Sequence, residues 1–293
     1  MQFMLKKRRK INLLLIDQDV AAIGGAENIL NSLVGEFVKK GIAVKTVSNF
    51  RPFLQMQRAL GAKTTLTPTR MNIFGGLRGL FKFFLQLPWA FFWYGSLLRK
   101  YKKESGLLVM ISGFSDKIVV SPIANYFKIP VIWLEHSTLK PVFIRNFGLP
   151  KLFYKMAMKY QNLIITPSLY SKEKLTEELE VRESDIFVIP NGLRILTGNE
   201  VKILKNKKLQ FRRKFKIPKD SFVIGIMSRL QEEKGQDELI RGFVKVKKKI
   251  TNAFLVVAGK GNEREKLETL SKDLGLSNEV LFTGFIDEND KYK

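Results

Sequence analysis

Two cations in one loop have the types and the spacing to bind a diphosphate. Arg229 and Lys234 stand five positions apart, directly after the apolar run 222–227. In a loop between a strand and a helix, a guanidinium and an ammonium can converge on phosphate oxygens, and the helix N-terminus adds its dipole. The alternative is a loop with two solvated cations, which these residues alone leave open.

The single histidine of the chain, His136, directly follows the apolar run 131–135. This position predicts that it lies at the carboxyl end of a strand, where open α/β sheets bind ligands. A lone histidine is more often structural than functional. Both interpretations therefore remain open for His136.

Two pairs of glycines stand at predicted loops. Gly24 and Gly25 precede a predicted helix, and Gly259 and Gly261 follow a predicted strand. Glycine lets a backbone approach a ligand closely, and a helix N-terminus favours an anion. The first pair lacks the spacing of a dinucleotide-binding loop, so it could be an ordinary turn, and the second is a weak signal alone. Glu27 could serve the same site or simply favour the helix dipole.

Short apolar runs alternate with helical patterns along the chain, which predicts an α/β fold with a parallel sheet and crossover helices. The runs are rich in Val, Ile and Leu without alternation, as in strands covered on both faces. The predicted strands are 11–17, 42–48, 63–66, 107–112, 131–135, 163–166, 186–189, 222–227, 254–258 and 280–283, and the predicted helices include 26–40, 236–250 and 263–274.

A basic segment without acids divides the chain. We predict an N-terminal domain at 1–200, a basic linker with a short helix at 201–219, and a C-terminal domain at 220–293. The last domain has the pattern β-α-β-α-β, the first half of a doubly wound domain. Its first strand would be an exposed apolar edge. We therefore expect a chain that is incomplete at its C-terminus or is completed by another chain.

The chain has 51 Lys and Arg against 27 Asp and Glu, a net charge of +24 over 293 residues. This charge favours polyanions such as nucleic acid, an acidic membrane or phosphorylated ligands. The absence of cysteine excludes disulfides, thiolate metal sites and cysteine nucleophiles, and one histidine excludes a multi-histidine metal centre. No zinc finger or RNP signature is present, so we expect no specific nucleic-acid partner.

The aromatic segment 77–103 has apolar and aromatic residues, in part at helical spacing, followed by basic residues. Apolar residues in 77–85 recur at helical spacing, aromatic residues follow in 89–94, and a basic tail occupies 99–103. Two interpretations stand: a pair of helices facing the core, or an interfacial helix on anionic lipid. Pro88 interrupts a stretch shorter than the roughly 20 apolar residues of a spanning helix, so we expect no transmembrane helix.

The chain starts with a basic cluster at 6–10 and then the apolar run 11–16. The run stops at Asp17, and no small-residue cleavage site follows, so we predict a basic arm before a strand, not a signal peptide. Together with the basic surface, this indicates a cytoplasmic protein with peripheral association at the inner membrane face.

Five motifs occur in the order seen in glycosyltransferase family 4, and the chain resembles that family from about residue 11 to 285. The loop with Arg229 and Lys234 and the turn at 190–192 are the more specific parts of the resemblance. The motifs are Gly24-Gly25-Ala26-Glu27, Glu135-His136-Ser137, Val188-Ile189-Pro190-Asn191-Gly192, Ser228-Arg229-Leu230 with Lys234-Gly235, and Ala258-Gly259-Lys260-Gly261.

The resemblance implies the GT-B fold, in which two Rossmann-like domains face each other across the active site, here with the second domain present as its first half. It also implies a hexosyltransferase that moves a sugar from a nucleotide-sugar donor to an acceptor hydroxyl with retention, the acceptor being lipid-linked or a cell-surface polysaccharide. The nucleotide-sugar is a substrate, and no cofactor or metal is expected. The implied catalytic residues are His136, Arg229 and Lys234; the donor and phosphate residues are Gly24, Gly25, Arg229, Lys234, Gly259 and Gly261; and the acceptor-side residues are Gly25, Glu27 and Asn191.

The sequence departs from the family pattern after residues 281–285. Family members carry a pair of glutamates in an E-x7-E arrangement there, and Asp287, Glu288 and Asp290 do not reproduce this spacing. An alternative function follows from the departure: an inactive or split fragment that acts as a binding or scaffold subunit of a glycosyltransferase.

Overall fold

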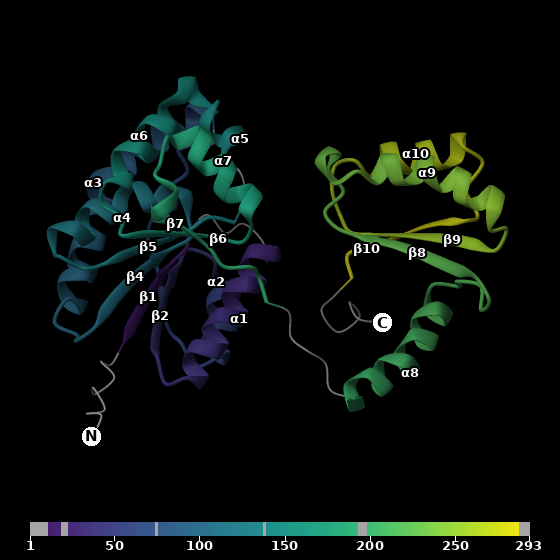
Figure 1. Cartoon of the computed structure of the whole chain (residues 1–293), viewed down its shortest axis with the longest axis horizontal. Coiled ribbons are helices and arrows are strands. Elements are labelled where there is room, and N and C mark those ends of the chain that lie inside the picture. The colour runs from purple at the N-terminus through teal and green to yellow at the C-terminus, as the bar shows by residue number, and fades with distance from the viewer. Residues whose placement is uncertain (1–10, 19–22, 74–75, 137–138, 193–197, 287–293) are drawn as a thin grey trace. The chain divides into compact units, whose positions relative to one another are not determined.

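The computed structural model divides the chain into two compact units, 1–192 and 193–293 (Figure 1). It describes residues 11–18, 23–73, 76–136, 139–192 and 198–286.

Unit 1 has the predicted alternation of strands and helices. Its elements are β1 (Asn12–Ile16), α1 (Gly25–Lys39), β2 (Ala43–Ser48), α2 (Arg51–Ala59), β3 (Lys63–Leu66), α3 (Gly76–Tyr101), β4 (Leu107–Ile111), α4 (Phe114–Tyr126), β5 (Val131–Leu134), α5 (Lys140–Phe143), η1 (Asn146–Gly148), α6 (Leu149–Met158), β6 (Leu163–Thr166), α7 (Leu169–Leu179), η2 (Glu183–Asp185) and β7 (Ile186–Val188).

Within the described residues, the strands of unit 1 form one parallel sheet of seven strands in the order β3-β2-β1-β4-β5-β6-β7. The order reverses between β1 and β4, where Ile16 pairs with Ile111. Because the strands are parallel, their carboxyl ends meet at one edge of the sheet. That edge, at the point of reversal, is where open α/β sheets bind ligands.

Helices cover both faces of this sheet (Figure 1). Leu30 and Val34 of α1 and Phe53 of α2 pack on one face. On the other face, α3, α4 and α6 pack over β1, β4 and β5, with Tyr94 and Tyr154 fully buried. Burial on both faces explains why these strands are continuous apolar runs instead of alternating ones.

Unit 2 is a smaller parallel sheet, which in the described part of the unit has three strands in the order β10-β9-β8. The described sheet leaves β8 at an edge, as predicted. Helices α9 and α10 cover one face and α8 lies against the other (Figure 1). The elements are α8 (Gly198–Lys214), β8 (Phe222–Met227), η3 (Glu232–Lys234), α9 (Gln236–Lys249), β9 (Ala253–Ala258), α10 (Arg264–Asp273) and β10 (Val280–Gly284).

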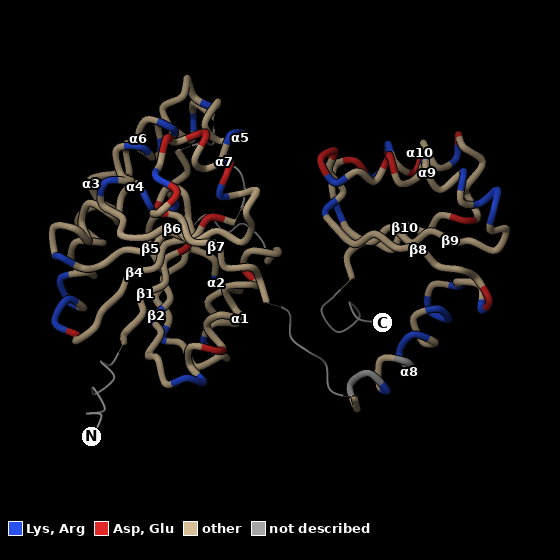
Figure 2. Tube along the Cα trace, viewed as in Figure 1, with Lys and Arg blue, Asp and Glu red and all other residues tan. Residues whose placement is uncertain are grey.

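The basic segment predicted as a linker at 201–219 overlaps α8, whose cations stand out in Figure 2. Arg212 folds back onto the following turn and donates hydrogen bonds to the carbonyls of Pro218, at 2.7 Å, and Ser221, at 3.1 Å. This guanidinium therefore holds the turn that leads into β8.

The aromatic segment forms one helix, α3, and not the pair of helices considered from the sequence. One side of α3 is buried through Phe83, Tyr94 and Leu98, while residues such as Phe81 and Phe92 are exposed. In the described part of the chain, no helix combines the length and the apolar character that crossing a bilayer requires.

Candidate active site

A buried polar network closes the sheet edge between β1 and β4. The backbone N–H of Gln18 donates to Oδ2 of Asp116 at 2.8 Å, and its side-chain amide donates to Oδ1 at 2.6 Å. The hydroxyl of Tyr94 donates to Oδ1 of Asp116, and the hydroxyl of Thr69 donates to the side-chain oxygen of Gln18, each at 3.0 Å. A Cβ at Gly113 would lie 2.2 Å from Oδ2 of Asp116, so a larger residue there would displace this carboxylate. The network therefore fixes Gln18, just after β1, to the first turn of α4, which follows β4.

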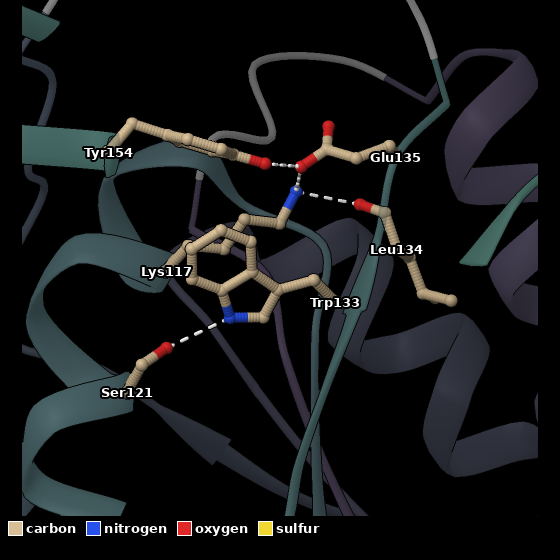
Figure 3. Close-up of polar contacts among 6 residues, drawn as sticks. All are labelled: Lys117, Ser121, Trp133, Leu134, Glu135 and Tyr154. Atoms are coloured by element: carbon tan, nitrogen blue, oxygen red, sulfur yellow. Dashed lines mark hydrogen bonds and ion pairs between the residues drawn. The ribbon is translucent and has the colours of Figure 1, made fainter. Parts of the chain in front are cut away.

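A second buried network stands at the end of β5 (Figure 3). Nζ of Lys117, on α4, lies 2.5 Å from Oε1 of Glu135 and donates to the carbonyl of Leu134 at 2.7 Å. The hydroxyl of Tyr154, whose pKa is raised well above its usual value by burial, stays protonated and donates to the same carboxylate. The ion pair is almost fully buried. It anchors the chain just before His136.

His136 therefore follows a fixed strand end, as predicted. Its Nε2 is buried and has no hydrogen-bond partner among the described residues. Burial lowers the pKa of His136 from 6.5 to about 4, with a smaller contribution from the positive charge of Lys117. At neutral pH the ring is uncharged, and its buried Nε2 lacks a described hydrogen-bond partner.

This pKa shift predicts how stability depends on pH. Between about pH 6.5 and pH 4 the unfolded chain binds a proton at His136 and the folded chain does not, so stability falls as the pH falls. Relative to His136→Gln, the wild type should lose about 2 kcal/mol of unfolding free energy between pH 7 and pH 5. Urea unfolding at both pH values measures this difference. Equal losses in the two proteins would contradict the shift.

The loop before α1 places the first glycine pair at the helix N-terminus. Gly24 and Gly25 are exposed, and a Cβ at Gly25 would meet no protein atom within 4 Å. The carboxylate of Glu27 accepts a hydrogen bond from the N–H of Gly24 at 2.7 Å. Glu27 thus caps the helix, a contact that the sequence analysis did not predict, and its acceptor-side role remains a prediction.

Asn191 is exposed after β7, which ends on the same sheet edge as β5. Its side chain forms no hydrogen bond with a described residue, and its acceptor-side role also remains a prediction. Ser137 of the histidine motif and Asp287, Glu288 and Asp290 lie outside the described residues.

In unit 2, Arg229 and Lys234 lie on the loop between β8 and α9, as predicted. Both side chains are exposed, and neither forms an ion pair with a described residue. Gly235 ends this loop in the left-handed region, at φ +68°, and α9 starts at the next residue. The first N–H groups of a helix have no acceptor within the helix backbone, so the loop places two cations without a described ion pair beside an N-terminus that can attract an anion. Acids share this region, namely Glu232, Glu233, Asp237 and Glu238.

The backbone of this loop is held from inside the unit. The side-chain amide of Gln236, which is buried, donates to Oγ of Ser228 and to the carbonyl of Arg229, both at 2.8 Å. The N–H of Leu230 donates to the carbonyl of Lys260 at 3.0 Å. The Arg229 backbone is therefore fixed while its side chain remains exposed.

The second glycine pair makes room for this loop. A Cβ at Gly259 would lie 1.8 Å from the carbonyl oxygen of Ser228, and one at Gly261 would lie 1.9 Å from that of Leu230. In the structure, the atoms that approach these glycines are thus carbonyls of the neighbouring loop. Contact of the glycines with a donor remains a prediction.

We expect Gly261→Ala to destabilise unit 2 by about 3 kcal/mol, because the methyl group would overlap fixed backbone atoms. Gly242→Ala is the matched control. Gly242 lies inside α9 with no atom within 4 Å of its Cβ position, so the same change should stabilise by about 1 kcal/mol. Urea unfolding followed by circular dichroism measures both. If both variants changed the free energy of unfolding in the same direction, this explanation of the two glycines would be wrong.

Family comparisons agree with the two units. The model of Glycosyltransferase Family 4 matches residues 23–195, more than half of the chain. The chain belongs to glycosyltransferase family 4. A second family model, glycosyl transferases group 1, matches residues 207–293. The fold of this family 4 chain is GT-B, as predicted, with its second unit described as β-α-β-α-β.

Individual relatives support the assignment. An uncharacterized glycosyltransferase of Methanocaldococcus jannaschii is 31% identical over 62% of this family 4 chain and 49% of its own length. The O-antigen biosynthesis glycosyltransferase WclY of Escherichia coli is 35% identical over 30% of the chain and 24% of its own. The chain thus matches about half or less of these relatives.

Solved structures share the fold. HepE of Anabaena, solved in complex with UDP, superposes with a TM-score of 0.71 and 18% identity, covering 96% of this family 4 chain and 71% of HepE. At this identity the likeness shows the fold alone.

Proposed function

We propose that this chain carries out, as a hexosyltransferase, the transfer of a sugar from a nucleotide-sugar donor to an acceptor hydroxyl with retention. One observation carries the proposal: Arg229 and Lys234 are exposed, neither forms an ion pair with a described residue, and both lie on the loop that leads into α9. Such a loop suits a diphosphate. The solved complex of HepE with UDP, a structural neighbour, supports a donor with a uridine diphosphate group.

The chemistry explains the need for two cations. Transfer breaks the bond between the anomeric carbon and the terminal phosphate oxygen, and the acceptor oxygen forms the new bond to that carbon. The phosphate oxygen takes the electron pair of the broken bond and gains negative charge, and it accepts the proton that the acceptor hydroxyl gives up. Cations that contact this oxygen stabilise the transition state more than the ground state, so they lower the barrier. Because Arg229 and Lys234 supply this charge, we propose no metal and no cofactor.

In unit 1, we assign to His136 a contact with the donor sugar. An uncharged imidazole with a buried, unpartnered Nε2 can form a hydrogen bond to a sugar hydroxyl without adding charge. Gly24 and Gly25 would let the backbone approach the donor phosphates, with Asn191 on the acceptor side. These roles follow the family motifs that the residues match.

The relatives and the net charge support the acceptor and the location that we propose. WclY is named for O-antigen biosynthesis, which favours a lipid-linked or cell-surface polysaccharide acceptor. A net charge of +24 favours peripheral association with an anionic membrane, on the cytoplasmic side.

A donor screen tests the proposal. The purified chain is incubated with uridine and guanosine diphosphate sugars, with and without saccharide acceptors, and release of nucleoside diphosphate is measured. We expect release with one donor class, and nuclear magnetic resonance of the product should show the donor's anomeric configuration. Binding without release would support the binding-subunit alternative, and neither binding nor release would contradict both.

A further inference from the structure

An exposed apolar stripe follows one side of α3. Leu77, Phe81, Leu85 and Phe92 recur at helical spacing, and each is about two-thirds exposed. Trp89 adds to the stripe and stacks on Phe92, with ring centroids 5.8 Å apart. The opposite side of the helix is buried in the core of unit 1, so α3 is fixed in place. An isolated exposed apolar residue is ordinary, but a continuous stripe of large ones marks an interaction surface.

The stripe runs into a basic hollow of about 600 Å³ at the C-terminal end of α3. The hollow lies between α3 and the end of α4, and Phe92 belongs to both the stripe and the hollow. Its cations are Arg99, Lys102 and Lys128, and its aromatic walls include Phe91 and Tyr126.

The charges around the hollow are of one sign. Helix α3 contains no Asp or Glu. Glu104, the acid nearest to it in the sequence, is paired with Lys45 at 2.5 Å. Nζ of Lys102 lies 4.9 Å from the ring centre of Phe127, a contact that leaves its charge uncompensated by an anion. The hollow therefore favours an anion.

Lys128 holds a backbone position that favours glycine. It follows α4 in the left-handed region, at φ +57°, and its N–H donates to the carbonyl of Asn125 at 2.9 Å. The N–H of Ile129 donates to the carbonyl of Ala124, which completes a helix C-cap of the kind that glycine usually forms. A lysine at this position costs stability that glycine would not cost, but it adds a cation to the hollow.

We propose that this stripe and hollow dock on an anionic phospholipid bilayer, with the stripe at the level of the acyl chains and the hollow around a lipid phosphate. Large aromatics beside cations match the apolar and anionic layers of a membrane surface. This inference rests on the membrane association proposed above, and it names the part of the protein that would contact the membrane. It does not depend on sugar transfer.

Vesicle binding tests the hollow first. The chain is mixed with phosphatidylcholine vesicles, with or without phosphatidylglycerol, and the bound fraction is measured by flotation. We expect binding that requires phosphatidylglycerol. Replacing Arg99, Lys102 and Lys128 by Gln should weaken the partition on the order of a hundredfold, since each cation near an anionic surface contributes about fivefold.

A matched variant controls for net charge. Lys39, Lys40 and Lys63 are exposed cations on α1, its C-terminal end and β3. Replacing these three by Gln removes the same charge, and we expect a several-fold smaller effect. Equal losses in the two triple variants would overturn the hollow as a site and leave only general attraction. No binding by the unmutated chain would overturn both this inference and the membrane association, whereas nucleotide binding would be unaffected.

Lys128→Gly separates binding from folding. Glycine suits the left-handed position, so the variant should unfold at a higher urea concentration than the wild type while binding vesicles about fivefold more weakly. A variant that is more stable and binds equally well would remove Lys128 from the site.

Fluorescence tests the stripe. Trp133 is buried and Trp93 is partly buried, so Trp89 is the exposed tryptophan of the described residues. We expect a blue shift when the chain binds vesicles, and Trp89→Phe should remove the shift while binding persists. Phe81→Ser with Leu85→Ser should weaken binding even with all cations present. A blue shift that persists in Trp89→Phe, or binding unchanged in the serine variant, would overturn the contact between stripe and lipid.

Discussion

We expect Arg229→Ala to lower the rate of sugar transfer by about 10² to 10³-fold, with little change in the free energy of unfolding. Its side chain is exposed and forms no ion pair with a described residue, so truncation removes no described packing. The loss arises because one fixed donor to the leaving oxygen contributes about 3–4 kcal/mol to transition-state stabilisation. Single-turnover rates with the donor found by the screen, together with urea unfolding, measure the two effects separately.

Arg241→Ala is the control for this change. Arg241 is also exposed in unit 2, on α9, and lacks a described ion pair. Its loss changes the net charge equally but leaves the loop of Arg229 intact. We expect transfer within about twofold of wild type. Similar rate losses in the two variants would mean that the overall charge of unit 2, and not the position of Arg229, acts on the donor.

Lys117→Met should destabilise unit 1 by about 3–5 kcal/mol, because it leaves Glu135 buried without its counter-charge. The pair is nearly inaccessible, and among the described side chains Tyr154 is the donor that remains to the carboxylate. The double variant Lys117→Met with Glu135→Gln should recover part of the loss, since no buried charge is then left unpaired. Urea unfolding of both variants measures the difference.

An exposed pair gives the matched control. Lys174 and Glu177 on α7 lie 2.7 Å apart at the surface. Lys174→Met should cost less than about 1 kcal/mol, because water screens an exposed pair and solvates the remaining carboxylate. If Lys117→Met cost no more than Lys174→Met, the anchor role of the buried pair at the end of β5 would be wrong.

The strands, the helices and the fold class could be predicted from the sequence because local patterns of apolar residues determine them. The strands at 63–66, 163–166 and 222–227 have the predicted bounds, and most of the others differ by about one residue at an end. Continuous apolar runs separated by helical patterns leave little choice of fold. For the same reason the prediction was confirmed that His136 follows a strand and that Arg229 and Lys234 lie on a loop between a strand and a helix.

The polar networks could not be predicted. Gln18 and Asp116 meet across 98 positions of the chain, and Lys117 lies on a helix whose sequence does not show which side is buried. The one available signal is that Asp116 and Lys117 are adjacent charges in an otherwise apolar helix. The sequence contained no signal for Gln236. Its role depends on the hydroxyl of Ser228 and the carbonyl of Arg229, which only folding brings near its side chain.

The aromatic segment shows another limit. Pro88 suggested a break, yet α3 continues through it from Gly76 to Tyr101. Proline removes one N–H and crowds the preceding turn, but extensive burial of the other side can outweigh that cost. Helical spacing indicated an apolar side of this segment but left open whether that side faces the core or the surface, and the hollow beside it required Lys128, which lies outside α3.

Calorimetric titration with a nucleoside, its monophosphate and its diphosphate tests the central claim, that Arg229 and Lys234 bind the diphosphate of the donor. The uridine and guanosine series are compared for the wild type and for the variant with both cations replaced by Ala. We predict that affinity increases with each phosphate in the wild type and that this increase is lost in the variant, while the nucleoside binds both equally. An increase that persists in the variant would contradict the claim.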